Sequence, residues 1–285
     1  SGFVGSHFIK NYSNEYNLIA ISLKETSIEQ LQLDGVDTVL HLAGISQQSK
    51  SIDCEKYREV NAKLTEKLAL RCREKGVTHF IFYSSVKVYG YDGNLDDMNF
   101  VLTENSPTKK SDSYGNSKIE AEETLLKLVT DNFKVAIVRP PMIYGPGVRG
   151  NMSLLMKLVD QFPVLPFNYE NNQRTIVSIG NLLHMTDLII KKKASGVFLG
   201  DDGEFISLKQ IIVLIAAGLG KKRKLIRLPH FLFQLLVRIK KNQMTRLFGS
   251  LAFKQADNYV SIGYHPIETN REAIHEMCRH YLAEK

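Results

Sequence analysis

The chain has 285 residues, of which 44% are hydrophobic and 24% charged, with a formal net charge of +7. This composition is typical of an ordinary globular protein and excludes a disordered or fibrous chain. Its three cysteines, Cys54, Cys72 and Cys278, are widely spaced, which argues against a metal site or a disulfide framework. No apolar run approaches the roughly 18 residues of a membrane span, and no nucleic-acid-binding module is visible. We therefore expect a cytoplasmic protein without metal or nucleic acid.

The first 200 residues alternate short apolar runs with longer amphipathic stretches, a pattern typical of a parallel sheet flanked by helices. The predicted strands are 17–23, 36–42, 78–84, 134–139 and 196–200. The predicted helices are 3–11, 55–75, 113–130, 152–161 and 180–192.

Beyond about residue 200 the pattern becomes mostly helical, and it predicts a smaller companion region. The stretch 230–241 is densely apolar and has a basic end. It could form a helix on a membrane surface. A helix packed against the main domain is the favoured interpretation, so we expect no peripheral membrane contact.

The chain opens with Gly2-Phe3-Val4-Gly5, which is typical of the end of a glycine-rich phosphate loop entering a helix. In dinucleotide-binding folds the first strand and the first glycine of that loop lie just upstream. We therefore expect the sequence to be a truncated piece of a longer one. A protein that works without this strand is the less favoured alternative.

Tyr114 and Lys118 lie four residues apart on the predicted helix 113–130, so they share one helix face. Positive charge near a phenol lowers its pKa, so we expect Lys118 to adapt Tyr114 for proton transfer near neutral pH. Ser84 and Ser85 close an apolar strand upstream, and Ser85 could hold the oxygen that gains or loses the proton. The alternative is an ordinary exposed helix pair worth about 0.3 kcal/mol.

Several further segments occur together with this pair and in a fixed order. They are VDTVLHLAG (36–44), Asn61, YSSVKVYG (83–90), SDSYGNSK (111–118) and RPPMIYGPG (139–147). Together they resemble the extended short-chain dehydrogenase/reductase family, in its nucleotide-sugar epimerase/dehydratase group. Segments 147–159, 171–183, 197–207 and 246–251 are similar to the branch that reduces UDP-4-keto-6-deoxy-N-acetylhexosamines, which borders the UDP-hexose 4-epimerases.

The resemblance implies an α/β protein with a Rossmann-like doubly wound parallel sheet, its first strand missing from this chain. Residues 1–145 plus 175–200 would form the NAD(P)-binding domain. Residues 146–174 plus 201–285 would form a smaller, mostly helical region that binds a UDP-sugar. Such proteins often form homodimers, here through the helices 55–75 and 113–130.

The resemblance also assigns roles within the site. Tyr114 would be the general acid/base, Lys118 would bond the nicotinamide ribose, and Ser85 would hold the sugar O4. Asn61 would support the proton relay, with helix bridging as the alternative. The further cofactor-binding candidates are Gly2, Phe3, Val4, Gly5, Leu42, Ala43, Gly44, Pro141 and Tyr144. The further substrate-binding candidates are Lys87, Arg149, Asn151 and Arg174, with rim packing as the alternative for Lys87 and a surface role for Arg174.

The expected ribose-binding carboxylate is absent from the end of the predicted strand 17–23. No acidic residue occurs there until Glu25, whereas Ser22 and Lys24 could receive a 2′-phosphate. This favours NADP over NAD.

Three functions fit these observations. The first is a UDP-4-keto-sugar 4-ketoreductase of surface polysaccharide biosynthesis, which is favoured. The second is a UDP-hexose 4-epimerase holding NAD tightly. The third is a non-catalytic dinucleotide-binding protein, because a fold does not fix a function.

Overall fold

A four-stranded parallel sheet forms the centre of the computed structural model, which describes residues 2–46, 53–255 and 258–285. Its order is β1-β2-β4-β8, so the predicted α/β architecture is confirmed. Helices cover both faces of the sheet, so the middle of β2 is completely buried. Burial on both faces explains why the sequence of β2 is continuously apolar. The strands are β1 (Thr38–His41), β2 (His79–Tyr83), β4 (Lys134–Arg139) and β8 (Gly196–Leu199).

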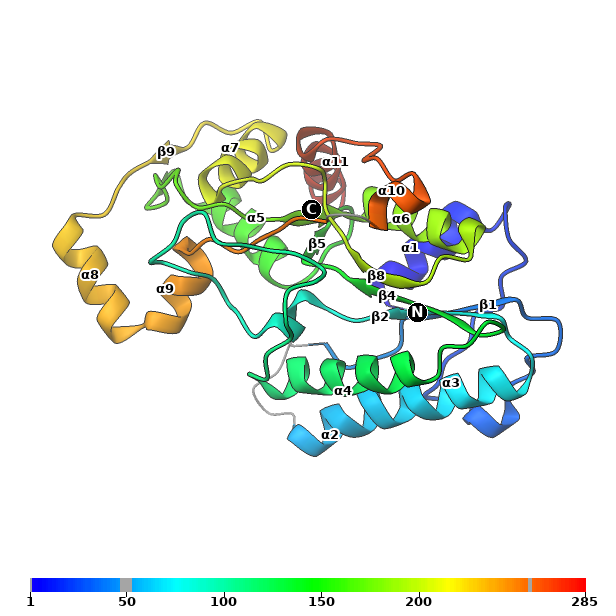
Figure 1. Ribbon diagram of the computed structural model, residues 1–285. Coiled ribbons are helices and arrows are strands. Elements are labelled where there is room, and N and C mark those ends of the chain that lie inside the picture. The colour runs from blue at the N-terminus through cyan, green and yellow to red at the C-terminus, as the bar shows by residue number, and fades with distance from the viewer. Residues whose placement is uncertain (1, 47–52, 256–257) are drawn as a thin grey trace.

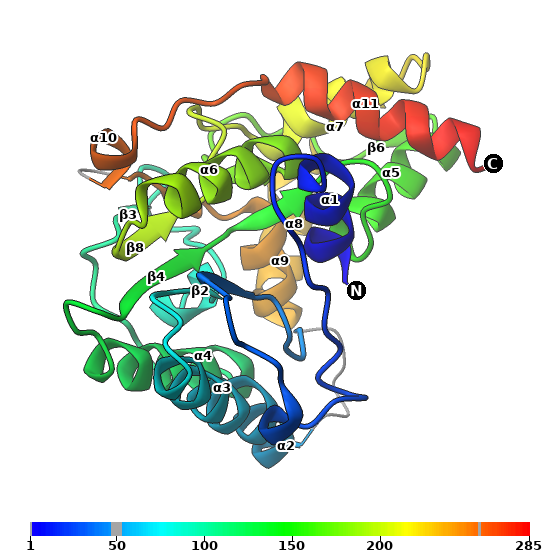
Figure 2. The ribbon, with the colours of Figure 1, turned by 90° about the vertical axis from the view of Figure 1, so that its right-hand side faces the viewer.

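Helices cover the sheet in two layers (Figures 1 and 2). One face carries α3 (Leu64–Glu74) and α4 (Ser113–Lys127), and the other carries α1 (Phe3–Tyr12) and α6 (Ile179–Lys192). Alternate residues of a strand point to opposite faces, so each strand contributes to both cores. Short α2 (Cys54–Arg58) and a π-helical turn, η2 (Glu59–Lys63), precede α3.

The C-terminal region adds a third apolar core beside the sheet. This core joins α5 (Asn151–Gln161), α7 (Leu208–Gly218) and α11 (Asn270–Ala283). Two further helices, α8 (His230–Ile239) and α9 (Lys241–Phe248), protrude at one end of the molecule (Figure 1). The remaining elements are η1 (Ile28–Gln30), η3 (Val86–Tyr89), β3 (Val101–Leu102), β5 (Met142–Tyr144), β6 (Val164–Leu165), β7 (Ile176–Ser178), β9 (Lys224–Leu225), β10 (Ala252–Phe253) and α10 (Asn258–Ile262).

Helix α8 packs on one face only. Phe233, Leu236 and Val237 contact the C-terminal core, but no residue of α8 is fully buried. The expected packing of this helix against the main domain therefore holds for one face of α8 and not for the other. Among the described residues, no helix is both long and apolar enough to cross a membrane.

The predicted strand 17–23 is wrong. The segment lies outside regular structure, and Ile19 and Ile21 are 64% and 44% exposed. Strand β1 is the edge of the described sheet and pairs only with β2, and the segment 17–23 does not pair with its free edge. A lone strand cannot satisfy its backbone hydrogen bonds within a sheet, so its apolar pattern alone does not make it one.

Candidate active site

The candidate site lies where β1, β2 and β4 end, the edge at which open parallel sheets bind ligands. The chain leaving β2 runs beside the chain leaving β4. The Ser84 amide donates to the Val138 carbonyl at 2.7 Å, and the Val86 amide donates to the Pro140 carbonyl at 3.3 Å. These bonds fix the backbone on both sides of Ser85.

Tyr114 lies in the first turn of α4, beside this backbone. Asp112 caps the helix by accepting from the Gly115 amide at 2.7 Å. A Cβ at Gly115 would lie 2.8 Å from the Lys87 carbonyl oxygen, so only glycine lets α4 approach the segment after Ser85 this closely. As a result, Tyr114 lies near Ser85, whose hydroxyl lowers the pKa of the phenol.

The pKa of Tyr114 is raised to about 12, chiefly by burial, while the Ser85 hydroxyl lowers it. The negative charge of Asp112 and that of an ionised Tyr57 raise the Tyr114 pKa further. The Tyr57 ring stands edge-on to the Tyr114 ring, with 6.0 Å between the ring centres. Desolvation is the largest influence on this phenol. The expectation that Lys118 depresses the Tyr114 pKa stays a prediction.

Lys118 is 5% exposed, and its ammonium donates to the Tyr83 carbonyl at the end of β2 at 2.8 Å. It also lies 4.5 Å from the centre of the Phe82 ring. Burial lowers its pKa to about 8, and the Glu122 carboxylate opposes this shift. An ammonium has three N–H donors, so two remain for a ligand.

Asn61 joins the loop after β1 to α4. It is fully buried within the π-helical turn η2, a local geometry often found at functional sites. Its amide pairs with the Ile45 backbone, accepting at 2.8 Å and donating at 3.0 Å, and Nδ2 also lies 3.1 Å from Ser117 Oγ. A Cβ at Gly44 would lie 2.9 Å from Asn61 Oδ1, so this loop requires glycine.

The other residues expected to hold the cofactor lie in three places. Gly2 precedes α1 as its N-cap, and Phe3, Val4 and Gly5 form the first turn of that helix. Leu42, Ala43 and Gly44 follow β1, with Ala43 and Gly44 exposed, and Pro141 follows β4 half-buried. Ser22 and Lys24 are exposed in the segment that is not a strand.

Tyr144 does not fit the role expected for it. Its side chain is fully buried, and its hydroxyl lies 2.8 Å from Asp202 Oδ2 and 3.0 Å from Asn270 Oδ1. These partners tie β5 to the C-terminal region. No surface of the Tyr144 side chain remains for a cofactor, so this expectation is wrong.

Arg174 is a cation without a carboxylate partner among the described residues. Its Nη2 donates to the carbonyls of Arg246 and Gly249, and its buried Nε has no partner there. Burial lowers its pKa to about 10. A partly desolvated guanidinium of this kind favours an anionic ligand, since Arg binds phosphates through paired N–H donors.

The remaining substrate candidates are less enclosed. Lys87 forms an ion pair with Asp92, which also accepts from the Arg246 guanidinium at 2.8 and 2.7 Å. Arg149 and Asn151 are exposed where α5 begins. No contact in the described part of the chain joins these two to the Ser85–Tyr114 pair.

Sequence reasoning missed the buried ion pair between Glu122 and Arg139. Their side chains are 3% and 6% exposed, and Arg139 Nη2 lies 2.6 Å from Glu122 Oε2. Arg139 also donates to the Tyr89 hydroxyl at 2.8 Å. The signal was present, because Glu122 continues the Tyr114–Lys118 face at the same spacing of four. This pair fastens the middle of α4 to the end of β4.

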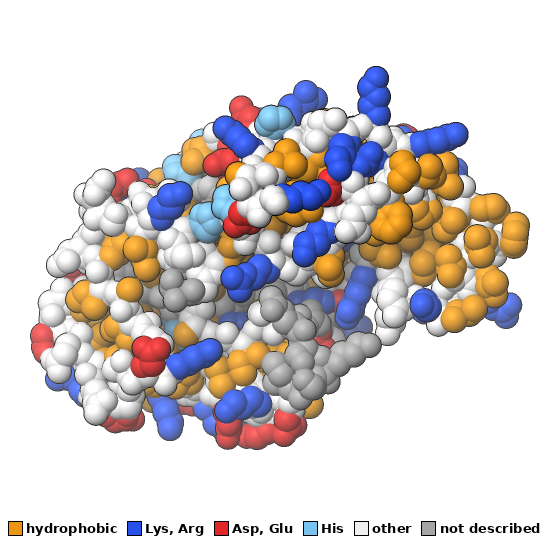
Figure 3. All heavy atoms as spheres, turned by 180° about the vertical axis from the view of Figure 1, so that it is seen from behind, with side chains coloured by type: hydrophobic (Ala, Val, Ile, Leu, Met, Phe, Trp, Pro, Cys, Tyr) orange, Lys and Arg blue, Asp and Glu red, His pale blue; other side chains and the backbone are white. Residues whose placement is uncertain are grey.

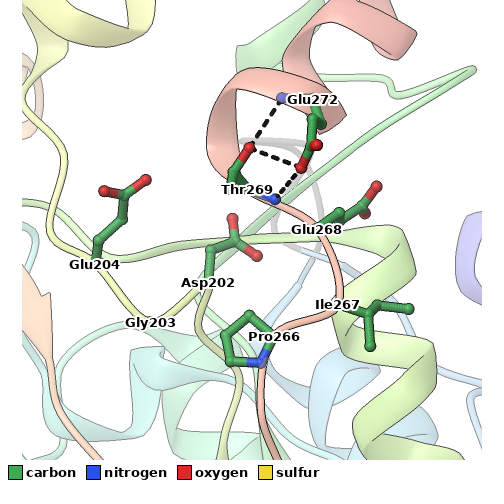
Figure 4. A pocket seen from close by; sticks show the side chains of 8 residues that line it. All are labelled: Asp202, Gly203, Glu204, Pro266, Ile267, Glu268, Thr269 and Glu272. Carbon is green, nitrogen blue, oxygen red and sulfur yellow. Dashed lines mark hydrogen bonds between the residues drawn. The ribbon is translucent and has the colours of Figure 1, made fainter.

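A shallow acidic depression of about 340 Å³ lies elsewhere, between the segment after β8 and the start of α11 (Figure 4). Its carboxylates have structural partners. Asp202 accepts from the Ser178 amide at 2.8 Å, Glu268 accepts from the Ser178 hydroxyl at 2.5 Å, and Glu272 completes the capping box with Thr269. Within the described residues no cluster of acidic, His or Cys side chains could hold a metal ion.

A Rossmann-type sheet with Ser, Tyr and Lys gathered at its carboxyl edge defines a short-chain dehydrogenase/reductase. Residues 1–199 match the NAD dependent epimerase/dehydratase family, and the chain belongs to that family. It is 31% identical to UDP-glucose 4-epimerase from Vibrio cholerae over 99% of this chain and 93% of that protein.

A second relative is N-acetyl-alpha-D-glucosaminyl-diphospho-ditrans,octacis-undecaprenol 4-epimerase from Escherichia coli O157:H7. It is 27% identical over 81% of this chain and 73% of its own. Among solved structures, RMD from Pseudomonas aeruginosa complexed with NADPH has a TM-score of 0.76 at 17% identity, covering 100% of this chain and 97% of its own. MoeE5 in complex with UDP-glucose and NAD has a TM-score of 0.74 at 19% identity, covering 99% and 96%. These two structures support the fold.

Proposed function

We propose that this protein is a 4-epimerase of a UDP-hexose, with Tyr114 moving the proton at the sugar O4. The observation that carries the proposal is the placement of Tyr114, in the first turn of α4, beside Ser85 at the carboxyl edge of the sheet, near enough for Ser85 to lower the pKa of the phenol. The two relatives whose printed names are 4-epimerases support the reaction class.

The chain fits a nicotinamide dinucleotide. Gly44 leaves open the space that a Cβ would fill, 3.5 Å from the Lys118 ammonium, so a flat ring or ribose can approach the backbone closely. The N-terminus of α1 suits a diphosphate, since its free N–H groups favour anions. When bound, the dinucleotide supplies hydride transfer and, in its oxidised form, a positive charge that lowers the Tyr114 pKa.

The chain's own residues then act on the sugar O4. Epimerisation requires Tyr114 to act in both directions: the phenolate would take the O4 proton as C4 is oxidised, and the phenol would return that proton to the alkoxide as C4 is reduced. Burial raises the pKa of Tyr114 to about 12, so the protonated phenol is the favoured form before a cofactor binds. Ser85 holds O4 beside the phenol, and the two free N–H donors of Lys118 hold a ribose. Asn61 keeps the loop after β1 against α4, so the distance between these groups stays fixed.

The substrate diphosphate has a candidate partner in Arg174, whose guanidinium lacks a carboxylate partner among the described residues. Residues 146–174 plus 201–285 would hold the nucleotide sugar, and residues 1–145 plus 175–200 the dinucleotide. Arg149 and Asn151 are further candidates for the diphosphate.

A UDP-4-keto-6-deoxy-N-acetylhexosamine 4-ketoreductase is the second candidate. It is supported by Ser22 and Lys24, which are exposed and have no carboxylate between them. A hydroxyl and an ammonium without a nearby carboxylate suit the extra 2′-phosphate of NADP. A reductase would use NADPH as a substrate that is oxidised and then exchanged in each turnover.

Two assays separate the candidates. An epimerase converts UDP-glucose or UDP-N-acetylglucosamine into its C4 epimer without net change in absorbance at the NAD(P)H band. A reductase oxidises added NADPH in proportion to the UDP-4-keto sugar supplied. Activity in neither assay, with the dinucleotide still bound, would instead favour a non-catalytic dinucleotide-binding protein.

A further inference from the structure

Positive charge is concentrated in one part of this chain. The segment 205–256 contains 11 Lys and Arg residues and no Asp or Glu. Those 11 charges exceed the net charge of +7, so the rest of the chain is net negative. Three of these cations, Lys209, Lys221 and Arg246, already have carboxylate partners. Cations that share one face without such partners mark a surface for an anionic partner.

The same segment contains an apolar stripe that faces solvent. Phe231, Leu235 and Ile239 occur at spacing four on α8, and they are 74%, 48% and 67% exposed. Residues at this spacing share a helix face. Figure 3 shows hydrophobic side chains gathered at the end of the molecule formed by α8 and α9, with Lys and Arg side chains around them.

The other side of α8 holds this stripe in place. The Phe233 ring stands edge-on to the Phe248 ring of α9 at 5.3 Å, and it packs against Tyr169 at 5.2 Å. Leu236 and Val237 contact the C-terminal core. The helix therefore has two apolar faces, and only one of them has a partner within the described structure.

Cations flank the exposed stripe without counterions. Arg238, Lys240 and Lys241 are exposed, and no ion pair among the described residues includes them. Arg246 differs, since Asp92 neutralises it. These three cations, which have no ion-pair partner in the described part of the chain, lie where α8 meets α9, beside the C-terminal end of the stripe.

We propose that the α8–α9 hairpin docks on an anionic lipid surface, with Phe231, Leu235 and Ile239 entering the headgroup boundary. The unpaired cations then meet lipid phosphates, the arrangement typical of interfacial helices. A second copy of the chain fits less well. A two-fold interface between identical patches would bring Arg238, Lys240 and Lys241 close to the same cations of the other copy.

Docking would take place next to the candidate site. Arg246 of α9 bonds Asp92, which pairs with Lys87 two residues after Ser85, and the Arg246 carbonyl accepts from Arg174. The surface that meets lipid is therefore connected to the substrate end of the site by direct contacts.

Vesicle flotation of the full chain tests the proposal. We expect the protein to float with vesicles of phosphatidylcholine mixed with phosphatidylglycerol, and to stay behind with phosphatidylcholine alone or in high salt. The double variant Phe231→Gln/Ile239→Gln should lose flotation. Val260→Gln is the matched control, since Val260 is an apolar side chain 84% exposed on α10.

Charge variants give an independent readout. Each cation near an anionic surface strengthens binding about fivefold, so Lys240→Gln/Lys241→Gln should weaken it about 25-fold. Lys56→Gln/Lys67→Gln, which removes two exposed lysines on α2 and α3, should leave it unchanged. Because all these side chains are exposed, the variants should melt like the parent.

Three results would overturn the proposal. The parent protein could fail to float with the anionic vesicles, or the α8 variants could float as well as their controls. Alternatively, light scattering could show a dimer that Phe231→Gln/Ile239→Gln dissociates while neither protein binds vesicles, which would assign the face to a second copy.

Discussion

Removing the Glu122 carboxylate should destabilise the protein far more than removing any exposed carboxylate of α4. Glu122 receives three contacts from the Arg139 guanidinium, at 3.0, 3.2 and 2.6 Å. Glu122→Ala leaves a guanidinium that is 6% exposed, and the partners that remain to it among the described residues are the neutral Tyr89 hydroxyl and the Glu104 carbonyl. Breaking a buried pair from one side costs about 3–5 kcal/mol. We expect a loss of that size in the free energy of unfolding.

Urea unfolding of three variants measures this loss. Glu120→Ala is the matched control on the same helix, because Glu120 pairs with Arg58 in solvent, with side chains 39% and 50% exposed. It should cost less than about 1 kcal/mol. Glu122→Leu/Arg139→Met should recover most of the stability, since it removes both charges and refills the space. Equal losses for Glu122→Ala and Glu120→Ala would refute the reasoning.

Further predictions concern pH, the loop after β1 and the candidate diphosphate site. Burial lowers the pKa of His41 from 6.5 to about 3, so the unfolded chain binds the proton first and stability should fall as the pH drops below 6.5. Urea unfolding on either side of pH 6.5 should show a smaller fall for His41→Gln, and an equal fall would contradict this assignment. Gly44→Ala places a methyl group 2.9 Å from Asn61 Oδ1, so calorimetry should show weaker NAD(P) binding, and unchanged affinity would contradict this role for the loop. Arg174→Gln should weaken UDP binding about tenfold or more, as expected for a lost charge-assisted hydrogen bond, and unchanged affinity would exclude Arg174 from the site.

Apolar runs in the sequence correctly predicted the central strands of the sheet. The runs at 78–84 and 134–139 become β2 and β4 because their residues are buried on both faces. The segment 17–23 has a similar pattern and stays irregular, since a strand also needs a neighbour with which to pair. The apolar pattern of a segment indicates that its residues can be buried, but it does not reveal whether a neighbouring strand is available for pairing.

In the candidate site, too, residue spacing predicted some features, whereas others depend on contacts between residues that are distant in sequence. The spacing of four predicts that Tyr114 and Lys118 share a face, and the structure brings Ser85 to that face. The Tyr114 pKa depends on burial and on Asp112, which spacing does not reveal. Tyr144 matched a motif, but its environment depends on Asp202 and Asn270, which are distant in sequence.

The central claim is that the Tyr114 hydroxyl moves the proton at C4 of a UDP-hexose. Proton NMR of UDP-glucose or UDP-N-acetylglucosamine incubated with the protein and NAD reports the C4 epimer directly. We predict that the parent protein and the Tyr281→Phe control form the epimer, and that Tyr114→Phe binds NAD but forms none. Unchanged epimer formation by Tyr114→Phe would contradict the account.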